Sequence, residues 1–154
     1  MQLVDIISPD RVATNVLAKS KKRAFETISD LIASNSNISM GTNDIFDSLN
    51  ARERLGTTAI GNGIAIPHGR VKESTKTIGA FMQLRDGVDC DAPDNQSVRL
   101  MFAVLVPEKT DEEHLLLLAR LAKMFKNPEL CEQLLTAPDN TALYDLLIGW
   151  DKAN

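Results

Sequence analysis

The chain has 154 residues and a formal net charge of −4, with 44% hydrophobic and 25% charged residues. This composition is typical of one globular domain with a sizeable core and argues against a disordered or fibrous chain. Because acidic and basic residues are intermixed, neither a basic face for nucleic acid nor a cationic stripe for anionic lipid is expected. We expect a single domain over residues 1–154, with its core at residues 5–150.

No apolar stretch approaches the roughly 20 residues of a membrane-spanning helix. The first ten residues carry acid rather than the basic head of a signal peptide. We therefore expect a cytoplasmic protein without membrane insertion. Cys90 and Cys131 lie far apart and form no CxxC pair, so buried or half-buried thiols are expected rather than zinc binding or redox pairing.

The N-terminal part of the chain is expected to be helical. Ser8 followed by Pro9 is typical of a cap and a first helical position, which predicts a single short turn over residues 10–16. Ser20 can cap a longer helix, in which apolar residues recur at helical spacing until the polar run at residues 34–37.

A second helix is expected to begin where Thr42 or Asn43 can cap it. Ile45, Leu49 and Arg52 follow along one side, and the helix ends before a glycine-threonine break at residues 56–58. Arg52 is therefore placed near a helix end.

Three segments are expected to be strands. Residues 64–66 form a brief apolar run between glycines, and residues 77–84 are mixed in pattern. Residues 98–106 are almost continuously apolar, which predicts a central strand buried on both faces. The polar stretch at residues 85–96 predicts a loop or an irregular hairpin. Its acidic residues lack the ordered spacing of a calcium loop, so a solvated loop is favoured over a cation site.

Three helices are expected to complete the chain. Residues 110–125 begin with a capping-box pattern and continue with apolar residues at helical spacing. Asn127 and Pro128 open the next helix, and Asp139 or Asn140 caps the last one. The order is helices, then strands, then helices, which predicts an α/β fold with a small mixed sheet covered by helices.

The main functional candidate is His68, one of two histidines, which follows the apolar run at residues 64–66. Pro67 and Gly69 flank it, so its ring is expected on a stiff turn. With an ordinary pKa of about 6.5, a neutral imidazole keeps a nitrogen lone pair available as a base, ligand or nucleophile. The alternative is a loop histidine with a satisfied hydrogen bond, or an ordinary buried strand end.

The second histidine, His114, falls near the first turn of its expected helix. Helix amides and the helix dipole favour a bound anion there, so a neutral His114 facing His68 could donate to an oxygen of a group carried on His68. Arg52 adds a permanently charged donor fork suited to phosphate oxygens, with Arg54 and Arg70 as competitors. Each of these residues can also be a plain surface residue, but together they favour phosphoryl transfer over hydrolysis.

Other chemistries fit the sequence less well. It has no G-x-S-x-G elbow, no P-loop and no HExxH pair. Two histidines fall short of the three protein ligands usual for a catalytic zinc, and no carboxylate is spaced to complete the set. No metal and no cofactor is therefore expected.

Two segments carry a family signature. They consist of Arg52-Glu53, Gly56-Thr57-Thr58, Ile60 through Gly69, and then Leu105-Val106-Pro107 with His114-Leu115 and Leu117-Leu118-Ala119. Together they resemble the active-site segments of the fructose/mannitol-type enzyme IIA domains of the bacterial phosphoenolpyruvate-dependent phosphotransferase system. The sequence G-N-G-I-A-I-P-H-G most resembles that of the nitrogen-related regulatory enzyme IIA, although Ala59 occupies a position where that branch often has Gly.

This resemblance implies a mixed five-stranded sheet flanked by helices. It also implies that His68 is phosphorylated on its tele nitrogen by the phosphohistidine of the small carrier HPr or its nitrogen-branch counterpart. His114 would stabilise the phosphoryl group, and Arg52 would contact the phosphate or the carrier. The backbone amides after His68 are further candidates for contact with the phosphoryl group.

Two hypotheses of function follow. In the first, the chain is a phosphotransferase of the phosphocarrier kind, which either regulates partner proteins in the nitrogen branch or passes phosphate to an enzyme IIB of a sugar permease. In the second, the chain is a non-catalytic binding module that contacts kinases, transporters or channels and is switched by the charge at His68.

Overall fold

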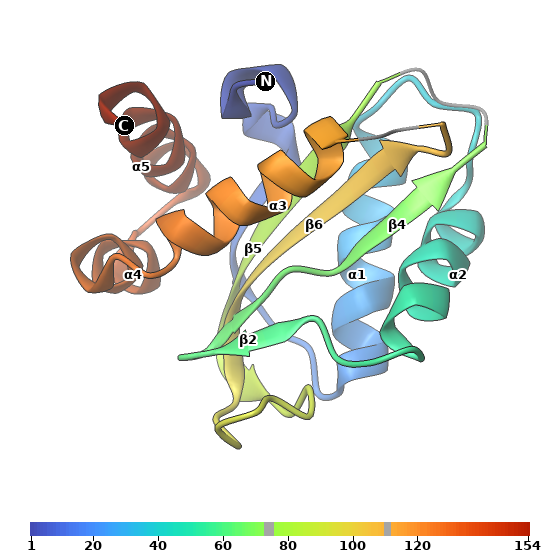
Figure 1. Cartoon of the computed structure of the whole chain (residues 1–154). Helices are drawn as coiled ribbons and strands as arrows, with labels where there is room; N and C mark the ends of the chain where they lie inside the picture. The colour runs from blue at the N-terminus through green and yellow to red at the C-terminus, as the bar shows by residue number, and fades with distance from the viewer. Residues whose placement is uncertain (73–75, 110–111) are drawn as a thin grey trace.

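A computed structural model describes residues 1–72, 76–109 and 112–154. One mixed β-sheet lies between two groups of helices, with α1 and α2 against one face and α3, α4 and α5 against the other (Figure 1). This arrangement confirms the expected α/β fold. The elements, in order, are two 3-10 helices η1 (Leu3–Asp5) and η2 (Pro9–Arg11), then β1 (Val12–Val16), α1 (Lys21–Ser34), α2 (Thr42–Glu53), β2 (Ala59–Gly61), β3 (Ile64–Ala65), β4 (His68–Val71), β5 (Ile78–Val88), β6 (Val98–Pro107), α3 (Glu112–Met124), α4 (Pro128–Thr136) and α5 (Asn140–Ala153).

The sheet is built around β6, as its continuous apolar sequence predicts. Strand order is β1-β5-β6-β3-β2, and β4 also pairs with β6. The β6 strand is antiparallel to β5 and parallel to both β3 and β4. Since β3 pairs with the start of β6 and β4 with its end, the chain from Ile64 to Val71 runs along one edge of β6. His68 is thereby fixed opposite Val104.

Alternation along β6 divides the core into two clusters. Met101, Ala103 and Leu105 pack with α1 and α2, while Phe102 and Val104 pack with α3, α4 and α5. All of these side chains are buried, so β6 loses the polar alternation that a half-exposed strand shows. The central strand therefore holds both helix layers in place.

The helix caps agree in part with the expected ones. Ser20 accepts from the Arg23 backbone N–H, and Asp139 accepts from that of Ala142, as predicted for α1 and α5. The α2 helix differs, because Gly41 rather than Thr42 or Asn43 is its N-cap residue. The expected capping box of α3 begins at residues 110 and 111, which lie outside the described residues.

The expected strand count is wrong: within the part of the chain that the structure describes, the sheet has six strands rather than five. The sequence also predicts a helical turn over residues 10–16, whereas only Pro9–Arg11 is helical and Val12–Val16 forms β1, parallel to β5. A strand therefore precedes the first long helix. The β5 strand runs on to Val88, into the expected loop. In each case, pairing with a neighbouring strand outweighs a weak local signal.

The turn between β2 and β3 has the sequence Asn62-Gly63. Both residues have positive φ, 57° and 79°, as a two-residue type I′ hairpin turn requires. The Asn62 N–H donates to the Asp94 carboxylate at 2.8 Å, which ties this turn to the loop between β5 and β6. The turn sends the chain along β6 toward His68.

Both cysteines are free thiols, as predicted. Cys90 is buried and Cys131 is half-buried. Burial raises the pKa of the Cys90 thiol to about 11, so it is un-ionised at neutral pH. Within the described residues, the helices are all too short or too polar to cross a membrane.

Candidate active site

His68 is the first residue of β4 rather than part of a turn, which corrects the expectation drawn from the flanking proline and glycine. Its Nδ1 lies 2.9 Å from the carbonyl oxygen of Ile66. A carbonyl can only accept a hydrogen bond, so the proton of a neutral ring is placed on Nδ1. The lone pair of the half-buried His68 ring is then on Nε2, the tele nitrogen.

The structure brings the second histidine to the first. His114 lies in the first turn of α3, as predicted, and its side chain is buried with a relative exposure of 8%. The two ring centroids are 5.9 Å apart, with the ring planes at 65°. The Nε2 atom of His114 is buried and has no hydrogen-bond partner among the residues the structure describes. An unpaired buried ring nitrogen beside His68 is a ready partner for an added polar group.

Both histidines border a pocket of about 490 Å³, and Arg52 and Arg70 line it with them. The guanidinium of Arg52 donates to the carbonyl of Gly56 at 2.8 Å, and that of Arg70 donates to the carbonyl of Glu108 at 3.0 Å. The complete lining is Ser48, Ala51, Arg52, Leu55, His68, Gly69, Arg70 and His114.

The three candidate arginines differ in their position relative to the pocket. Arg52 and Arg70 both reach the pocket, whereas Arg54 is exposed and lies outside its lining. From the sequence, Arg70 is named only as an alternative to Arg52. Its position two residues after His68 on β4 indicates that both side chains lie on the same side of the strand, because alternate residues of a strand share one face.

The electrostatics of the pocket keep both rings neutral. Burial lowers the pKa of His68, and the positive charge of Arg52 and the neighbouring His114 lower it further, against the Ile66 hydrogen bond and the charge of Glu53. Burial also lowers the pKa of His114, with a second contribution from Arg70. Neutral imidazoles beside fixed guanidinium charges suit an incoming dianion.

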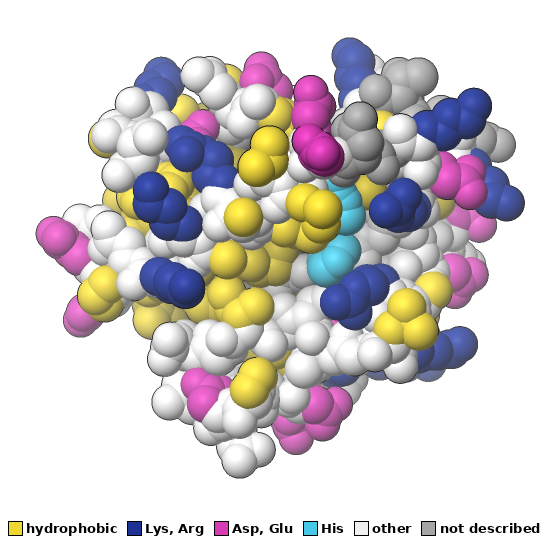
Figure 2. All heavy atoms as spheres, viewed as in Figure 1, with side chains coloured by type: hydrophobic (Ala, Val, Ile, Leu, Met, Phe, Trp, Pro, Cys, Tyr) yellow, Lys and Arg dark blue, Asp and Glu magenta, His cyan; other side chains and the backbone are white. Residues whose placement is uncertain are grey.

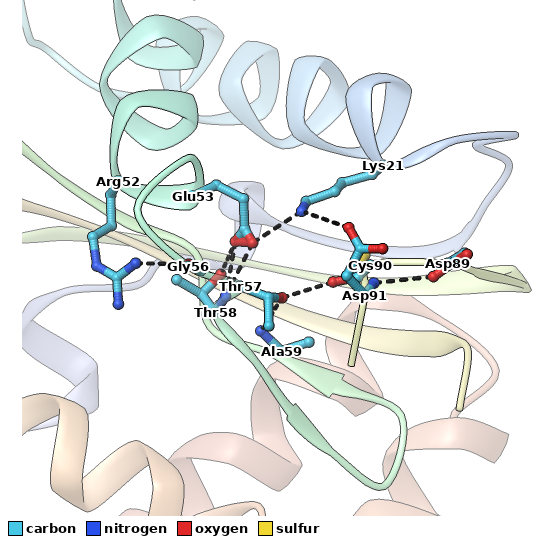
Figure 3. A network of polar contacts seen from close by, with 10 residues as sticks. All are labelled: Lys21, Arg52, Glu53, Gly56, Thr57, Thr58, Ala59, Asp89, Cys90 and Asp91. Atoms are coloured by element: carbon cyan, nitrogen blue, oxygen red, sulfur yellow. Dashed lines mark hydrogen bonds and ion pairs between the residues drawn. The ribbon is translucent and has the colours of Figure 1, made fainter. Parts of the chain in front are cut away.

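A buried carboxylate behind the pocket was missed in the sequence. Glu53, at the end of α2, is only 6% exposed and is joined to Thr58 and Lys21 (Figure 3). The sequence does indicate that Glu53 is buried, because it follows Ile45 and Leu49 at four-residue steps on the buried face of α2. An acid in that series is unusual and needs partners.

The surface around the histidines is divided in character. Figure 2 shows the two histidines next to each other, with hydrophobic side chains directly adjoining them on the left and Lys and Arg side chains directly adjoining them on the right. Leu55, Leu115 and Leu116 are 85%, 66% and 69% exposed; Leu55 lines the pocket, and Leu115 follows His114 in the chain. Exposed leucines at the edge of a pocket are typical of a surface that meets another protein.

Taken together, the pocket offers a nucleophilic ring nitrogen, an unpaired second imidazole and two fixed guanidinium groups. Among the described residues, no group of three or more His, Cys, Asp or Glu side chains is arranged to hold a metal ion. This set has the groups that a site of the phosphohistidine type requires, namely a histidine that can accept a phosphoryl group and nearby donors that can stabilise it.

Comparison with known proteins agrees with this class. The family described as "Phosphoenolpyruvate-dependent sugar phosphotransferase system, EIIA 2" matches residues 5–149. The chain therefore belongs to the type 2 enzyme IIA family of the phosphotransferase system, as its sequence resemblance predicts.

The relatives include nitrogen regulatory proteins. That of Pseudomonas aeruginosa is 41% identical over 148 residues, which are 96% of each chain. The crystal structure of the nitrogen regulatory protein IIA-Ntr from Neisseria meningitidis superimposes with a TM-score of 0.88 at 37% identity, covering 94% of this chain and 98% of that one. The Escherichia coli mannitol enzyme IIA, solved in complex with phosphorylated mannitol enzyme IIB, has the same fold, with a TM-score of 0.76 at 19% identity over 94% and 99% of the two chains.

Proposed function

We propose that this chain is a cytoplasmic phosphocarrier, in which Nε2 of His68 accepts a phosphoryl group from the phosphohistidine of an HPr-type carrier. The observation that carries the proposal is the hydrogen bond between His68 Nδ1 and the Ile66 carbonyl, because it leaves Nε2 unprotonated at the edge of the pocket. In this reaction the Nε2 lone pair forms the new N–P bond. The donor's N–P bond breaks, and its electron pair returns to the donor ring.

Each neighbouring group has a role in this transfer. Arg52 balances the charge of the phosphoryl oxygens with its guanidinium, and His114 donates a hydrogen bond to one of them from its unpaired Nε2. Arg70 supplies a second positive charge from β4. Because the transition state is largely dissociative, positioning and charge stabilisation provide most of the acceleration.

The decisive experiment is phosphoryl labelling. The protein is incubated with phosphoenolpyruvate, enzyme I and an HPr-type carrier, and the acid-labile phosphate is mapped to a residue and a ring nitrogen. We expect label on Nε2 of His68 and none in His68→Ala. Undiminished labelling in His68→Ala would overturn the proposal.

A matched variant separates acceptor from stabiliser. His114→Ala removes the second imidazole but retains the acceptor, so label should still appear on His68 and should form more slowly by roughly 100-fold. Label on His114 itself, or an unchanged rate, would contradict the roles assigned to the two rings.

We further propose that the phosphorylation state regulates partner proteins, because the relatives are named nitrogen regulatory proteins and two exposed leucines lie at the pocket, Leu55 in its lining and Leu115 beside His114 in the chain. Phosphorylation adds up to about two negative charges at the edge of this apolar surface, which changes what can dock there. Kinases, transporters or channels are the target classes. A pull-down with wild type, His68→Ala and His68→Asp tests this switch: equal binding of every partner to all three proteins would contradict it.

The sugar-transport alternative has a separate test. The mannitol enzyme IIA complex shows that a protein of this fold can meet an enzyme IIB. If this chain serves such a route, the labelled protein should pass its phosphate to a fructose/mannitol-type enzyme IIB. Retention of the label in the presence of enzyme IIB favours the regulatory role.

A further inference from the structure

We propose that Glu53 is a positioning residue that orients both His68 and Arg52 through two chains of hydrogen bonds. Its role in phosphoryl transfer rests on the function proposed above. The positioning itself is a property of the unphosphorylated protein.

The carboxylate of Glu53 is held by several partners. The Thr58 backbone N–H donates to both of its oxygens, at 2.9 and 3.0 Å, and the Thr58 hydroxyl donates to Oε1 at 2.5 Å. The Nζ of Lys21, at the start of α1, lies 3.1 Å from Oε2. Figure 3 shows these groups converging on Glu53 behind the loop that joins α2 to β2. A buried carboxylate with this many donors is held in one position.

The first chain of bonds leads from Glu53 to His68. The carbonyl of Thr58, whose N–H and hydroxyl are fixed by Glu53, accepts from the Ile66 N–H at 3.0 Å. The Ile66 carbonyl in turn accepts from Nδ1 of His68 at 2.9 Å. Four residues are therefore linked from the buried carboxylate of Glu53 to the ring that carries the lone pair. Movement of Thr58 displaces the carbonyl that decides which His68 nitrogen is protonated.

The second chain leads from Glu53 to Arg52. The loop after α2 is closed by the Gly56 N–H, which donates to the Glu53 carbonyl at 3.1 Å, and by the Thr58 bonds to the Glu53 carboxylate. Within this closed loop, the Gly56 carbonyl accepts from the Arg52 guanidinium at 2.8 Å. The same residue therefore sets the position of the carbonyl that directs Arg52 toward the pocket.

The network needs a carboxylate rather than an amide. Glutamate is acceptor-only, so both oxygens can receive the Thr58 and Lys21 donors, whereas glutamine turns an NH₂ group toward one of them. The charge of Glu53 also affects His68 directly. Burial lowers the pKa of His68, whereas the negative charge of Glu53 raises it.

The test compares unphosphorylated wild type with Glu53→Gln by ¹⁵N NMR of the imidazole rings, which reports the tautomer. In the wild type, we expect His68 to be protonated on Nδ1. In Glu53→Gln, the His68 signals should shift toward a mixture of tautomers, and the rate of phosphoryl uptake should fall by about tenfold or more. Thr58→Val, which removes only the hydroxyl donor, should produce a smaller change in the same direction.

Asp151→Asn is the matched control. Asp151 is also buried, accepts a backbone N–H from Leu3 and pairs with Arg120, but within the described residues its carboxylate makes no hydrogen bond to either histidine or to a residue bonded to the His68 ring. Its variant should leave the His68 signals unchanged. The proposal would be overturned if folded Glu53→Gln had the ring signals and uptake rate of the wild type. If Glu53→Gln does not fold, the same result in Thr58→Val would overturn it. A shift of the His68 signals in Asp151→Asn as large as that in Glu53→Gln would also overturn it. Absence of phosphoryl uptake by the wild type contradicts the proposed function, while the ring signals still decide the positioning.

Discussion

At the scale of single residues, the two histidines are kept neutral by burial together with different arginines. The pKa of His68 is lowered by burial and then by Arg52 and His114, and the pKa of His114 is lowered by burial and then by Arg70. In the proposed transfer both rings act in the neutral form, since His68 offers a lone pair and the arginines, rather than His114, neutralise the charge of the phosphate. The arginines therefore lower the pKa values of the two histidines already in the unphosphorylated protein.

This division predicts a crossed pattern in NMR titrations of the two rings. Arg52→Gln removes a positive charge near His68 and should raise the pKa of His68 toward its ordinary value of about 6.5. Arg70→Gln should raise the pKa of His114 instead. Each variant is the control for the other. Equal shifts of both rings in both variants would show that the two charges are not separated in this way.

At the scale of elements, the pocket depends on how closely α2 approaches β4. A Cβ atom added to Gly69 would overlap the Ser48 hydroxyl and lie 2.9 Å from the Ser48 carbonyl carbon, so no side chain fits there. The Ser48 hydroxyl also donates to the Arg70 carbonyl at 2.8 Å. This contact fixes the distance between the helix that carries Arg52 and the strand that carries His68.

We expect Gly69→Ala to lower the free energy of unfolding by about 1–3 kcal/mol and to slow phosphoryl uptake, because it separates α2 from β4. Removal of the hydroxyl in Gly69→Ala/Ser48→Ala should not restore either property, since the Ser48 backbone is part of the overlap. Gly149→Ala is the control: it lies in α5 with nothing within 4 Å of the added atom and should stabilise by about 0.5–1 kcal/mol. Chemical denaturation measures the stabilities and the labelling reaction measures the uptake, and full recovery of both in the double variant would contradict the backbone overlap.

The elements also show what the sequence could predict. The long helices and β6 were predictable because their apolar periodicity is set within each segment. The β2 and β4 strands were not, since they have three and four residues and contain glycine, and β4 gains its hydrogen bonds from the distant strand β6. For the site, motif and helix position selected His68, His114 and Arg52, which the structure places around one pocket, while their roles stay predictions. The bonds of Glu53 to Thr58 and Lys21 join separate elements and follow only from the fold.

At the scale of the whole molecule, a second buried carboxylate joins the two ends of the chain. Asp151, in α5, accepts from the Leu3 N–H at 2.8 Å and pairs with Arg120 of α3 at 2.6 Å. Arg120 also stacks over Trp150, with its guanidinium carbon 5.2 Å from the ring centroid. These contacts stabilise the helix layer opposite α1 and α2 and lie away from the pocket lining.

Asp151→Asn should therefore lower the free energy of unfolding by about 1–3 kcal/mol and leave the rate of phosphoryl uptake unchanged. Asp139→Asn is a suitable comparison, because asparagine also caps helices well and α5 should keep its start. Thermal unfolding and the labelling reaction measure the two properties separately. A large loss of uptake in folded Asp151→Asn would mean that α5 is coupled to the site.

The two histidines also link the stability of the whole molecule to pH. Folding lowers the pKa of both rings, chiefly by burial, below the value of about 6.5 expected in the unfolded chain. The unfolded state consequently binds protons first as the pH falls, so this contribution to stability is complete above about pH 6.5 and is lost as the pH decreases through the lowered pKa values. Asp94, whose pKa is lowered by hydrogen bonds from the backbone of Asn62 and Gln96, contributes in a separate window below its ordinary value of 3.8.

We therefore expect the free energy of unfolding of the wild type, measured in urea, to decrease between pH 8 and pH 5. A His68→Gln/His114→Gln variant lacks both titrating rings, and its stability should be nearly constant over the same range even if its absolute value is lower. The comparison depends on slopes rather than on absolute stability, so a general loss of packing in the variant does not affect it. Equal slopes in the two proteins would show that other groups govern this range. A flat wild-type profile would show that the rings are as easily protonated in the folded chain as in the unfolded one, which would also remove the basis for treating them as neutral partners in phosphoryl transfer.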